Sequence, residues 1–406
     1  MSQIHGEDHK ALAVLLDYRV DQLEGAVSDI RETTTGIALD MRSVATKIDT
    51  LIDLHEAAEG KRAKEAEGVL GEIVTADQKG EHHPFMAALE RARALLATAG
   101  NDAAQKQEAQ SLLRSIASVR GFYEQLALEE LGQSITVPER PAALTAPEKA
   151  LAQANPGLQR ALHAISIGLR AEGNREWNYS TNLHTPGGMS DRELLAAADL
   201  ACQRQVWDRC INTSERTKEV IDFEQRFPMP LRDIVVRRAG EVKLDPAYVY
   251  GLIRQESRFI MDARSGVGAS GLMQVMPATA KWTAKKIGMS SFTPDQITDK
   301  EVNVAIGTGY LKLVLDDFEG SMAMAAAAYN AGPGRPRNWR NGPVLEAAIW
   351  AENVPFQETR DYVKKVLSNT TNYAAILTRQ PQSLKARLGS VGPRTSPVAE
   401  VNKDLP

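Results

Sequence analysis

Cysteine, histidine and aromatic residues are scarce in this chain of 406 residues, and each shortage excludes a class of protein or site. The two cysteines are too few for a disulfide scaffold or for a zinc site with four cysteine ligands. No histidine follows His184, which excludes histidine catalysis from the C-terminal part of the chain. Aromatic residues make up only 5% and alanine is abundant, a composition that favours helices.

Long apolar runs and a strong basic charge are also missing. No stretch of about 20 apolar residues occurs, so we expect no transmembrane segment. The first ten residues, M-S-Q-I-H-G-E-D-H-K, lack the basic and apolar regions of a secretory signal, and no signal peptide is expected there. The net charge of −4 does not favour nucleic acid as a partner.

Residues 16–51 carry the most regular hydrophobic pattern of the chain. Apolar positions alternate at spacings of four and three, as in a heptad repeat, over about five repeats. An amphipathic helix packed on its own chain gives a similar pattern, but the regularity favours a coiled coil, with a second copy of the chain as the candidate partner. The positions are Leu16, Val20, Leu23, Val27, Ile30, Thr34, Ile37, Met41, Val44, Ile48 and Leu51.

Residues 81–240 read as a series of short amphipathic helices. One example is R-E-L-L-A-A-A-D-L-A-C-Q-R-Q at 192–205, and turn signals such as A-N-P-G at 154–157 separate the helices. Helix pairs of this size stack into α-solenoids, in which each pair buries a face that its neighbour completes. We therefore expect an α-helical superhelix or linker domain, although the sequence shows no strict repeat.

The two cysteines, Cys202 and Cys210, flank the turn-like stretch Q-V-W-D-R. On one straight helix, eight residues apart, they would lie about 12 Å from each other, too far for a disulfide. Across a helical hairpin they could bond. We favour two buried free thiols and keep the hairpin disulfide as the alternative.

Residues 241–380 give the clearest helix signals. Asp245 is a plausible N-cap with Pro246 at the first helical position, and the helix that follows carries Glu256. Apart from short extended pieces at 268–275, no strands are expected. Further helices are expected at 277–288, 302–318, 321–330 and 358–373.

Glu256 is the candidate catalytic residue. A free glutamate has a pKa of about 4.3, and burial against apolar groups raises the pKa of a carboxyl, so that it can donate a proton near neutral pH. The segment 265–276 supplies apolar groups such as Met273 and Val275 and carries no charge. An apolar wall with a few oriented polar groups is typical of a sugar-binding site.

Four sequence blocks, in matching order and spacing, resemble the catalytic domain of soluble lytic transglycosylases of the Slt type. The resemblance extends more weakly over part of 120–228 and does not cover 1–80. The blocks are E-S at 256–257, G-L-M-Q-V-M-P at 271–277, A-Y-N-A-G-P-G-R at 328–335 and V-P-F-Q-E-T-R-D-Y-V at 354–363.

The resemblance implies a mainly all-α protein with a lysozyme-like catalytic domain that cleaves peptidoglycan glycan strands in the periplasm or cell envelope. Neither a metal nor another cofactor is expected. The implied domains are a coiled-coil-like region at 1–80, a superhelix at 81–240, the catalytic domain at 241–380 and a C-terminal tail at 381–406. Matched block by block, Glu256 is the catalytic acid, and the substrate-binding residues are Ser265, Gln274, Met276, Tyr329, Asn330, Glu358 and Tyr362.

The resemblance also implies a mechanism with a single carboxylate, because no obvious second one accompanies Glu256. Most glycosidases use two carboxylates. Here Glu256 would act as acid and then as base, and the sugar's own 6-hydroxyl would attack, giving a 1,6-anhydro product. The alternatives are a hydrolytic goose-type lysozyme, for which Asp262 is the candidate water-holding residue, and a non-catalytic protein that binds or assembles on the cell wall.

Overall fold

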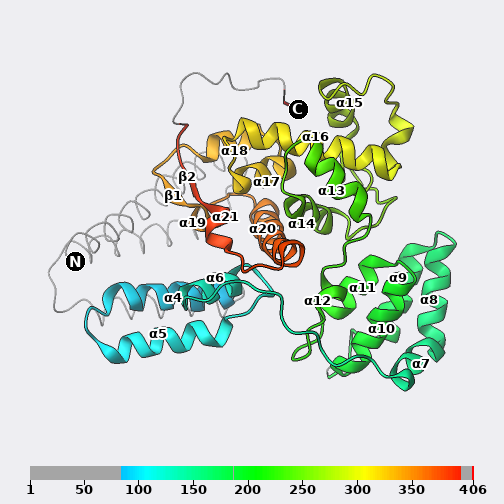
Figure 1. The fold of residues 1–406 in the computed structure, drawn as a ribbon, viewed down its shortest axis with the longest axis horizontal. Coiled ribbons are helices and arrows are strands. Elements are labelled where there is room, and N and C mark those ends of the chain that lie inside the picture. Colours follow the sequence, from blue (N-terminus) through cyan, green and yellow to red (C-terminus); the bar gives the residue numbers. More distant parts are fainter. Residues whose placement is uncertain (1–83, 186, 395–404) are drawn as a thin grey trace, which may run out of the picture. The chain divides into compact units, whose positions relative to one another are not determined.

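The structure is a computed structural model that describes residues 84–185, 187–394 and 405–406 (Figure 1). The heptad pattern at 16–51 lies outside the described residues, so the coiled coil stays a prediction. Within the described part, no helix is long and apolar enough to cross a membrane.

The described residues are mainly helical, which confirms the predicted fold class (Figure 1). They divide into two compact units, each assembled from segments distant in the sequence. The first unit contains 84–135, 314–368 and 383–394, and the second contains Thr136–Leu313 and Asn369–Gln382. Two helices, α16 (Lys300–Asp317) and α20 (Gln357–Thr378), contribute residues to both units.

The first unit begins with two long helices that lie side by side, α4 (Pro84–Thr98) and α5 (Ala103–Ile116) (Figure 1). Its only described sheet is an antiparallel pair of two-residue strands, in which Leu345 faces Val391. Sequence reasoning did not predict this pair because two residues are too short to show an alternating pattern. The remaining elements are α6 (Phe122–Glu130), α17 (Met322–Ala331), α18 (Gly334–Trp339), β1 (Leu345–Glu346), α19 (Ala347–Glu352), α21 (Leu384–Leu388) and β2 (Ser390–Val391).

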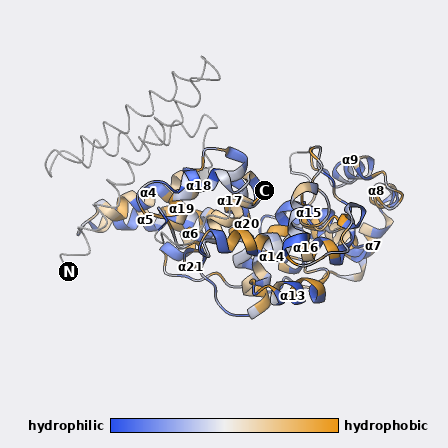
Figure 2. Ribbon diagram, turned by 90° about the horizontal axis from the view of Figure 1, so that it is seen from above, coloured by the Kyte–Doolittle hydropathy of each residue, from blue (hydrophilic) through white to orange (hydrophobic). Residues whose placement is uncertain are grey.

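The second unit opens with helical hairpins, and α8 packs on α9 as α10 packs on α11. Its helix α13 carries both hydrophilic and hydrophobic residues (Figure 2). The elements are α7 (Ala146–Ala154), α8 (Pro156–Ser166), α9 (Arg170–Ser180), α10 (Asp191–Gln203), α11 (Trp207–Ser214), α12 (Phe223–Arg226), α13 (Arg232–Glu241), α14 (Pro246–Glu256), α15 (Pro277–Lys286) and the 3-10 helix η1 (Pro294–Thr298).

Local capping explains where several of these helices begin. Thr145 and Glu148 form a capping box at the start of α7, and Ser190 and Glu193 form another at the start of α10. In each box the two side chains satisfy backbone N–H groups that a helix leaves unpaired in its first turn.

The cysteines form a disulfide, so the expectation of two free thiols is wrong. Cys202 lies in α10 and Cys210 in α11, and the turn between these helices brings their Cα atoms to 5.1 Å. This separation is within the range for a disulfide. The chain does not continue as one straight helix, because α10 ends at Gln203 and α11 starts at Trp207.

The disulfide borders the hydrophobic core of the hairpins. Trp177 is the largest member of this core, is 1% exposed, and donates an Nε1–H hydrogen bond of 2.8 Å to the hydroxyl of Thr213. Burying a large indole with its one polar group paired avoids the cost of an unsatisfied donor.

Candidate active site

Glu256 is the last residue of α14 and is half-buried. The predicted start of the helix is confirmed, since the Asp245 side chain accepts a hydrogen bond from the N–H of Ala247 and Pro246 follows it. Beyond Glu256 the chain turns sharply, because Arg258 and Phe259 adopt positive φ angles of 49° and 65°. Non-glycine residues rarely adopt this conformation, and it places Glu256 at a helix end rather than within a helical surface.

A buried arginine fixes the last turn of α14. The guanidinium of Arg254 donates 3.0 Å to the carbonyl of Arg226, 3.1 Å to Oδ1 of Asn369 and 2.6 Å to the carboxylate of Glu215. The same guanidinium lies 4.6 Å from the centre of the Phe227 ring. Two residues before Glu256, Arg254 therefore ties α14 to three other segments of the second unit.

The Glu215 carboxylate is the charged partner of Arg254. Burial alone would raise the pKa of Glu215, but the positive charges of Arg254, Arg258 and Arg226 outweigh burial and hold this pKa below its ordinary value. Glu215 thus favours its charged form and keeps Arg254 paired.

The segment after α14 folds into a compact loop in which two predicted substrate-binding residues bond to the loop itself. The hydroxyl of Ser265 accepts 2.9 Å from the N–H of Ala269. The amide of Gln274 donates 3.0 Å to the carbonyl of Ala263 and 2.7 Å to that of Gly271. Isolated β-bridges confirm the short extended pieces expected at 268–275.

Asn303 in α16 anchors this loop. Its fully buried side chain accepts 2.8 Å from the N–H of Met273 and donates 3.0 Å to the carbonyl of Ser270 and 2.8 Å to that of Ile297. Gly271 has a φ of +80°, and a side chain there would collide with Asn303. The contacts with Asn303 therefore fix the shape of the loop.

The two methionines of the loop differ in exposure. Met273 is fully buried and belongs to the core, whereas Met276 is 40% exposed. Of the two, only Met276 presents its side chain to a ligand from solvent.

The other predicted residues lie in the first unit. α17 buries a run of small residues, Ala323–Ala328 with Met324, and then carries the half-buried Tyr329 and Asn330 at its end. Gly332 follows with a φ of +80° and ends the helix.

Asn330 and Glu358 come together, although 28 residues separate them in the sequence. The amide nitrogen of Asn330 lies 3.4 Å from a carboxylate oxygen of Glu358. Thr359, which is 3% exposed, donates a hydroxyl hydrogen bond of 2.6 Å to the Asn330 side chain. Glu358 is exposed in the first turn of α20, where a negative charge is favoured by the helix dipole, and Tyr362 is only 5% exposed.

Sequence reasoning missed the supporting residues Arg254, Asn303 and Thr359. Each acts through partners that are far away in the sequence, so spacing alone does not reveal it. The sequence offered one signal, which is a polar residue at a helix position that faces the core, as Asn303 and Arg254 both are.

No group of three or more His, Cys, Asp or Glu side chains within 84–185, 187–394 and 405–406 is placed to hold a metal ion. The second unit thus offers a half-buried carboxyl, Glu256, and a rigid loop, and the first unit offers the Asn330 amide, which the Thr359 hydroxyl holds.

Comparison with protein families gives two matches. Residues 234–346 match the family described as "Transglycosylase SLT domain", and residues 353–382 match "Soluble lytic transglycosylase helical domain". The first match contains Glu256, the loop at 263–276 and the pair Tyr329 and Asn330.

Curated relatives carry related names. The soluble lytic murein transglycosylase of Salmonella typhimurium is 34% identical over 284 residues, covering 69% of this chain and 42% of the relative. That of Escherichia coli K12 is 32% identical, covering 70% of this chain and 43% of the relative. The chain thus spans less than half the length of these relatives.

The solved structures that are similar to this chain are also lytic transglycosylases. The lytic transglycosylase Slt from Pseudomonas aeruginosa, solved as an inactive mutant with glutamine in place of a glutamate, has a TM-score of 0.68 and 32% identity, covering 84% of this chain and 53% of that chain. The 70 kDa soluble lytic transglycosylase of Escherichia coli has a TM-score of 0.58 over 92% of this chain and 63% of that chain, and its 23% identity supports the fold alone. Residues 234–346 of this chain therefore form a transglycosylase SLT domain of the kind found in soluble lytic murein transglycosylases.

Proposed function

We propose that the protein is a peptidoglycan lytic transglycosylase that cleaves the β-1,4 bond between N-acetylmuramic acid and N-acetylglucosamine without consuming water. The observation that carries the proposal is the position of Glu256, a half-buried carboxyl at the end of a helix braced by Arg254, inside the matched domain. The named activity of the relatives supports the same reaction.

Glu256 acts first as the acid and then as the base. It donates its proton to the bridging oxygen, and the bond from that oxygen to the anomeric carbon of the muramic acid breaks. The 2-acetamido group of the sugar stabilises the positive charge that develops at the anomeric carbon. The 6-hydroxyl of the same sugar then attacks this carbon and returns its proton to Glu256, so that a 1,6-anhydro ring forms and the carboxyl regains its starting state.

The remaining predicted residues are proposed to bind the glycan strand: Ser265, Gln274, Met276, Tyr329, Asn330, Glu358 and Tyr362. The structural support for this role differs from residue to residue. The rigid loop presents Met276 to solvent, and the pairing of Asn330 with Glu358 joins two of the blocks that carry the family resemblance. Ser265 and Gln274 contribute through the loop shape that their hydrogen bonds maintain.

We propose that the protein acts in the periplasm or cell envelope, where peptidoglycan is found. The disulfide between Cys202 and Cys210 supports this location, because disulfides persist in oxidising compartments.

The test replaces Glu256 by glutamine, which keeps the shape of the side chain and removes its proton chemistry. We expect cleavage of purified sacculi to fall by about 10²–10⁴-fold, the usual contribution of a general acid, while thermal unfolding is unchanged. Glu241→Gln, at an exposed carboxylate of the same domain, is the matched control and should keep full activity.

Mass spectrometry of the products decides the type of reaction. The wild-type protein should release anhydro ends, which are lighter by one water molecule than the reducing ends left by a hydrolase. Reducing ends would support a goose-type hydrolase instead, and full activity of Glu256→Gln would remove Glu256 from the reaction.

A further inference from the structure

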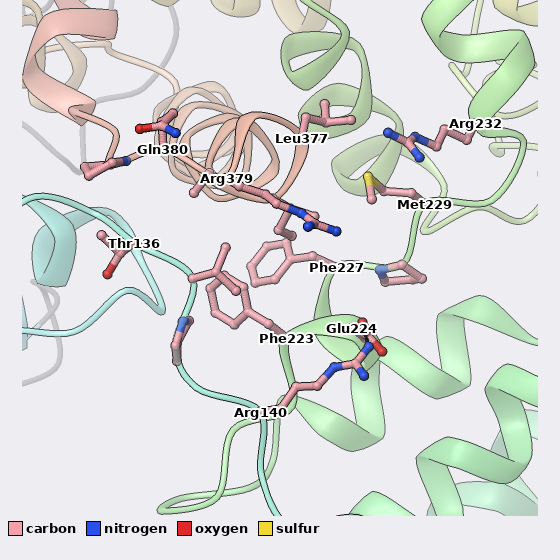
Figure 3. A pocket seen from close by; sticks show the side chains of 16 residues that line it. Thr136, Arg140, Phe223, Glu224, Phe227, Met229, Arg232, Leu377, Arg379 and Gln380 are labelled. Carbon is pink, nitrogen blue, oxygen red and sulfur yellow. Dashed lines mark hydrogen bonds and ion pairs between the residues drawn. The ribbon is translucent and has the colours of Figure 1, made fainter.

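A cavity of about 820 Å³ lies in the second unit, and none of its lining residues is assigned to the active site (Figure 3). Three segments line it: the irregular stretch that begins at Thr136, the segment from Phe223 to Arg232 around α12, and the end of α20 with the residues that follow it. Its volume is in the range of pockets that hold small ligands or short peptides.

The floor of the cavity is aromatic and apolar. The rings of Phe223 and Phe227 lie 4.8 Å apart and side by side in the cavity (Figure 3). Pro228, Met229 and Val137 extend this surface. Such a floor gains free energy by covering the alkyl groups of a ligand.

The rim of the cavity is positively charged. Arg140, Arg232 and Arg379 line it, and Glu224 is the only acidic residue among the lining residues. Glu224 is paired with Arg140. Within the described part of the chain, Arg232 and Arg379 form no ion pair, and both side chains are exposed (Figure 3). Two guanidinium groups therefore remain to bind a ligand.

Guanidinium groups beside an apolar floor match a ligand that combines carboxylates with small alkyl groups. Arginine binds carboxylates through two parallel hydrogen bonds, so two free arginines favour a ligand with more than one carboxylate. The peptides attached to peptidoglycan strands have this chemistry, since they contain acidic residues and alanine. The sugar rings carry no charge once the lactyl carboxyls of muramic acid are bound as amides, so these rings alone would leave both arginines unused.

We propose that this cavity is a second, non-catalytic site that binds the acidic peptide of peptidoglycan, with Arg232 and Arg379 holding its carboxylates and Phe223 and Phe227 covering its alkyl groups. The identity of the natural ligand rests on the proposed function. The binding chemistry itself rests only on the cavity.

Calorimetric titration of the full chain with an N-acetylated Ala-Glu-Ala tripeptide tests the site directly. We expect binding, and a loss of about tenfold or more in affinity for each of Arg232→Gln and Arg379→Gln. The same tripeptide with both carboxylates amidated should bind correspondingly weakly. A protein carrying Arg175→Gln and Arg204→Gln, two exposed arginines outside the cavity, is the matched control and should bind as the wild type does.

The outcome separates this site from the proposed activity, because the tripeptide has no glycosidic bond. Glu256→Gln should bind it with unchanged affinity. On sacculi, the double variant Arg232→Gln with Arg379→Gln should lose rate, whereas the control with Arg175→Gln and Arg204→Gln should match the wild type. Absence of tripeptide binding, equal binding by the double variant, or equally effective competition by inorganic phosphate would overturn the assignment.

Discussion

Asn303 illustrates how a single side chain can determine the shape of a site that it does not enter. Its amide uses its oxygen and both hydrogens in three hydrogen bonds of 2.8 to 3.0 Å, all in the interior. At the residue scale, sequence reasoning selected side chains by chemical type, and it found Gln274 because this residue lies within the recognisable block at 271–277. It did not find Asn303, because the partners of Asn303 are distant in sequence and become neighbours only when the chain folds.

We expect Asn303→Ala to lower the free energy of unfolding by about 2–4 kcal/mol, because it removes three buried hydrogen bonds. Cleavage of sacculi should also fall, since the loop at 263–276 loses its anchor. Urea unfolding and product release measure the two effects. Asn338→Ala, at an exposed asparagine in α18, should change stability by less than about 0.5 kcal/mol. If Asn303→Ala were as stable as the wild type, the three hydrogen bonds would make no net contribution to the free energy of unfolding.

At the scale of elements, α14 begins where its sequence predicts and ends where tertiary contacts dictate. Asp245 and Pro246 are local signals, and the sequence was sufficient to place them. The ion pair between Arg254 and Glu215 fixes the C-terminal end of α14, and it was not predicted because the two residues are distant in the sequence. The same limit explains the cysteines, because the pairing depends on a hairpin turn whose geometry periodicity does not specify.

Glu215 makes the stability of this element depend on pH. Its pKa in the folded protein is below the ordinary value of about 4.3, so its stabilisation is present above that pH and is lost as the pH falls through the folded pKa. The carboxylate is 36% exposed, and solvent screening reduces its contribution. We expect Glu215→Gln to cost about 1 kcal/mol at pH 7 and to become indistinguishable from the wild type in acid.

Urea unfolding at a series of pH values measures this difference. Glu219→Gln, four residues away and without an ion pair in the described part of the chain, is the control and should show no such pH dependence. A deficit of Glu215→Gln that stays constant into acid would show that the loss comes from packing rather than from the charge.

At the scale of the whole molecule, the helical character was predictable, but the grouping of distant segments into compact units was not. Composition and periodicity divide a chain into continuous segments. The compact units of this protein are discontinuous, since residues 314–368 belong with 84–135 and residues 369–382 belong with 136–313. Such grouping depends on contacts between distant segments, about which a local pattern carries no information.

The heptad pattern at 16–51 leads to a prediction for the assembly of the full chain. A seam of apolar side chains at spacings of four and three needs a partner helix to cover it, and a second copy supplies the same seam. We expect the wild-type protein to sediment as an oligomer at micromolar concentration. Ile30→Asp with Ile37→Asp should give monomers, because each places a charge where the partner seam must pack. Ser28→Asp with Thr35→Asp adds the same charge outside the seam and should stay oligomeric. A monomeric wild type in analytical ultracentrifugation would mean that the seam packs within its own chain, and both double variants would then show the same sedimentation.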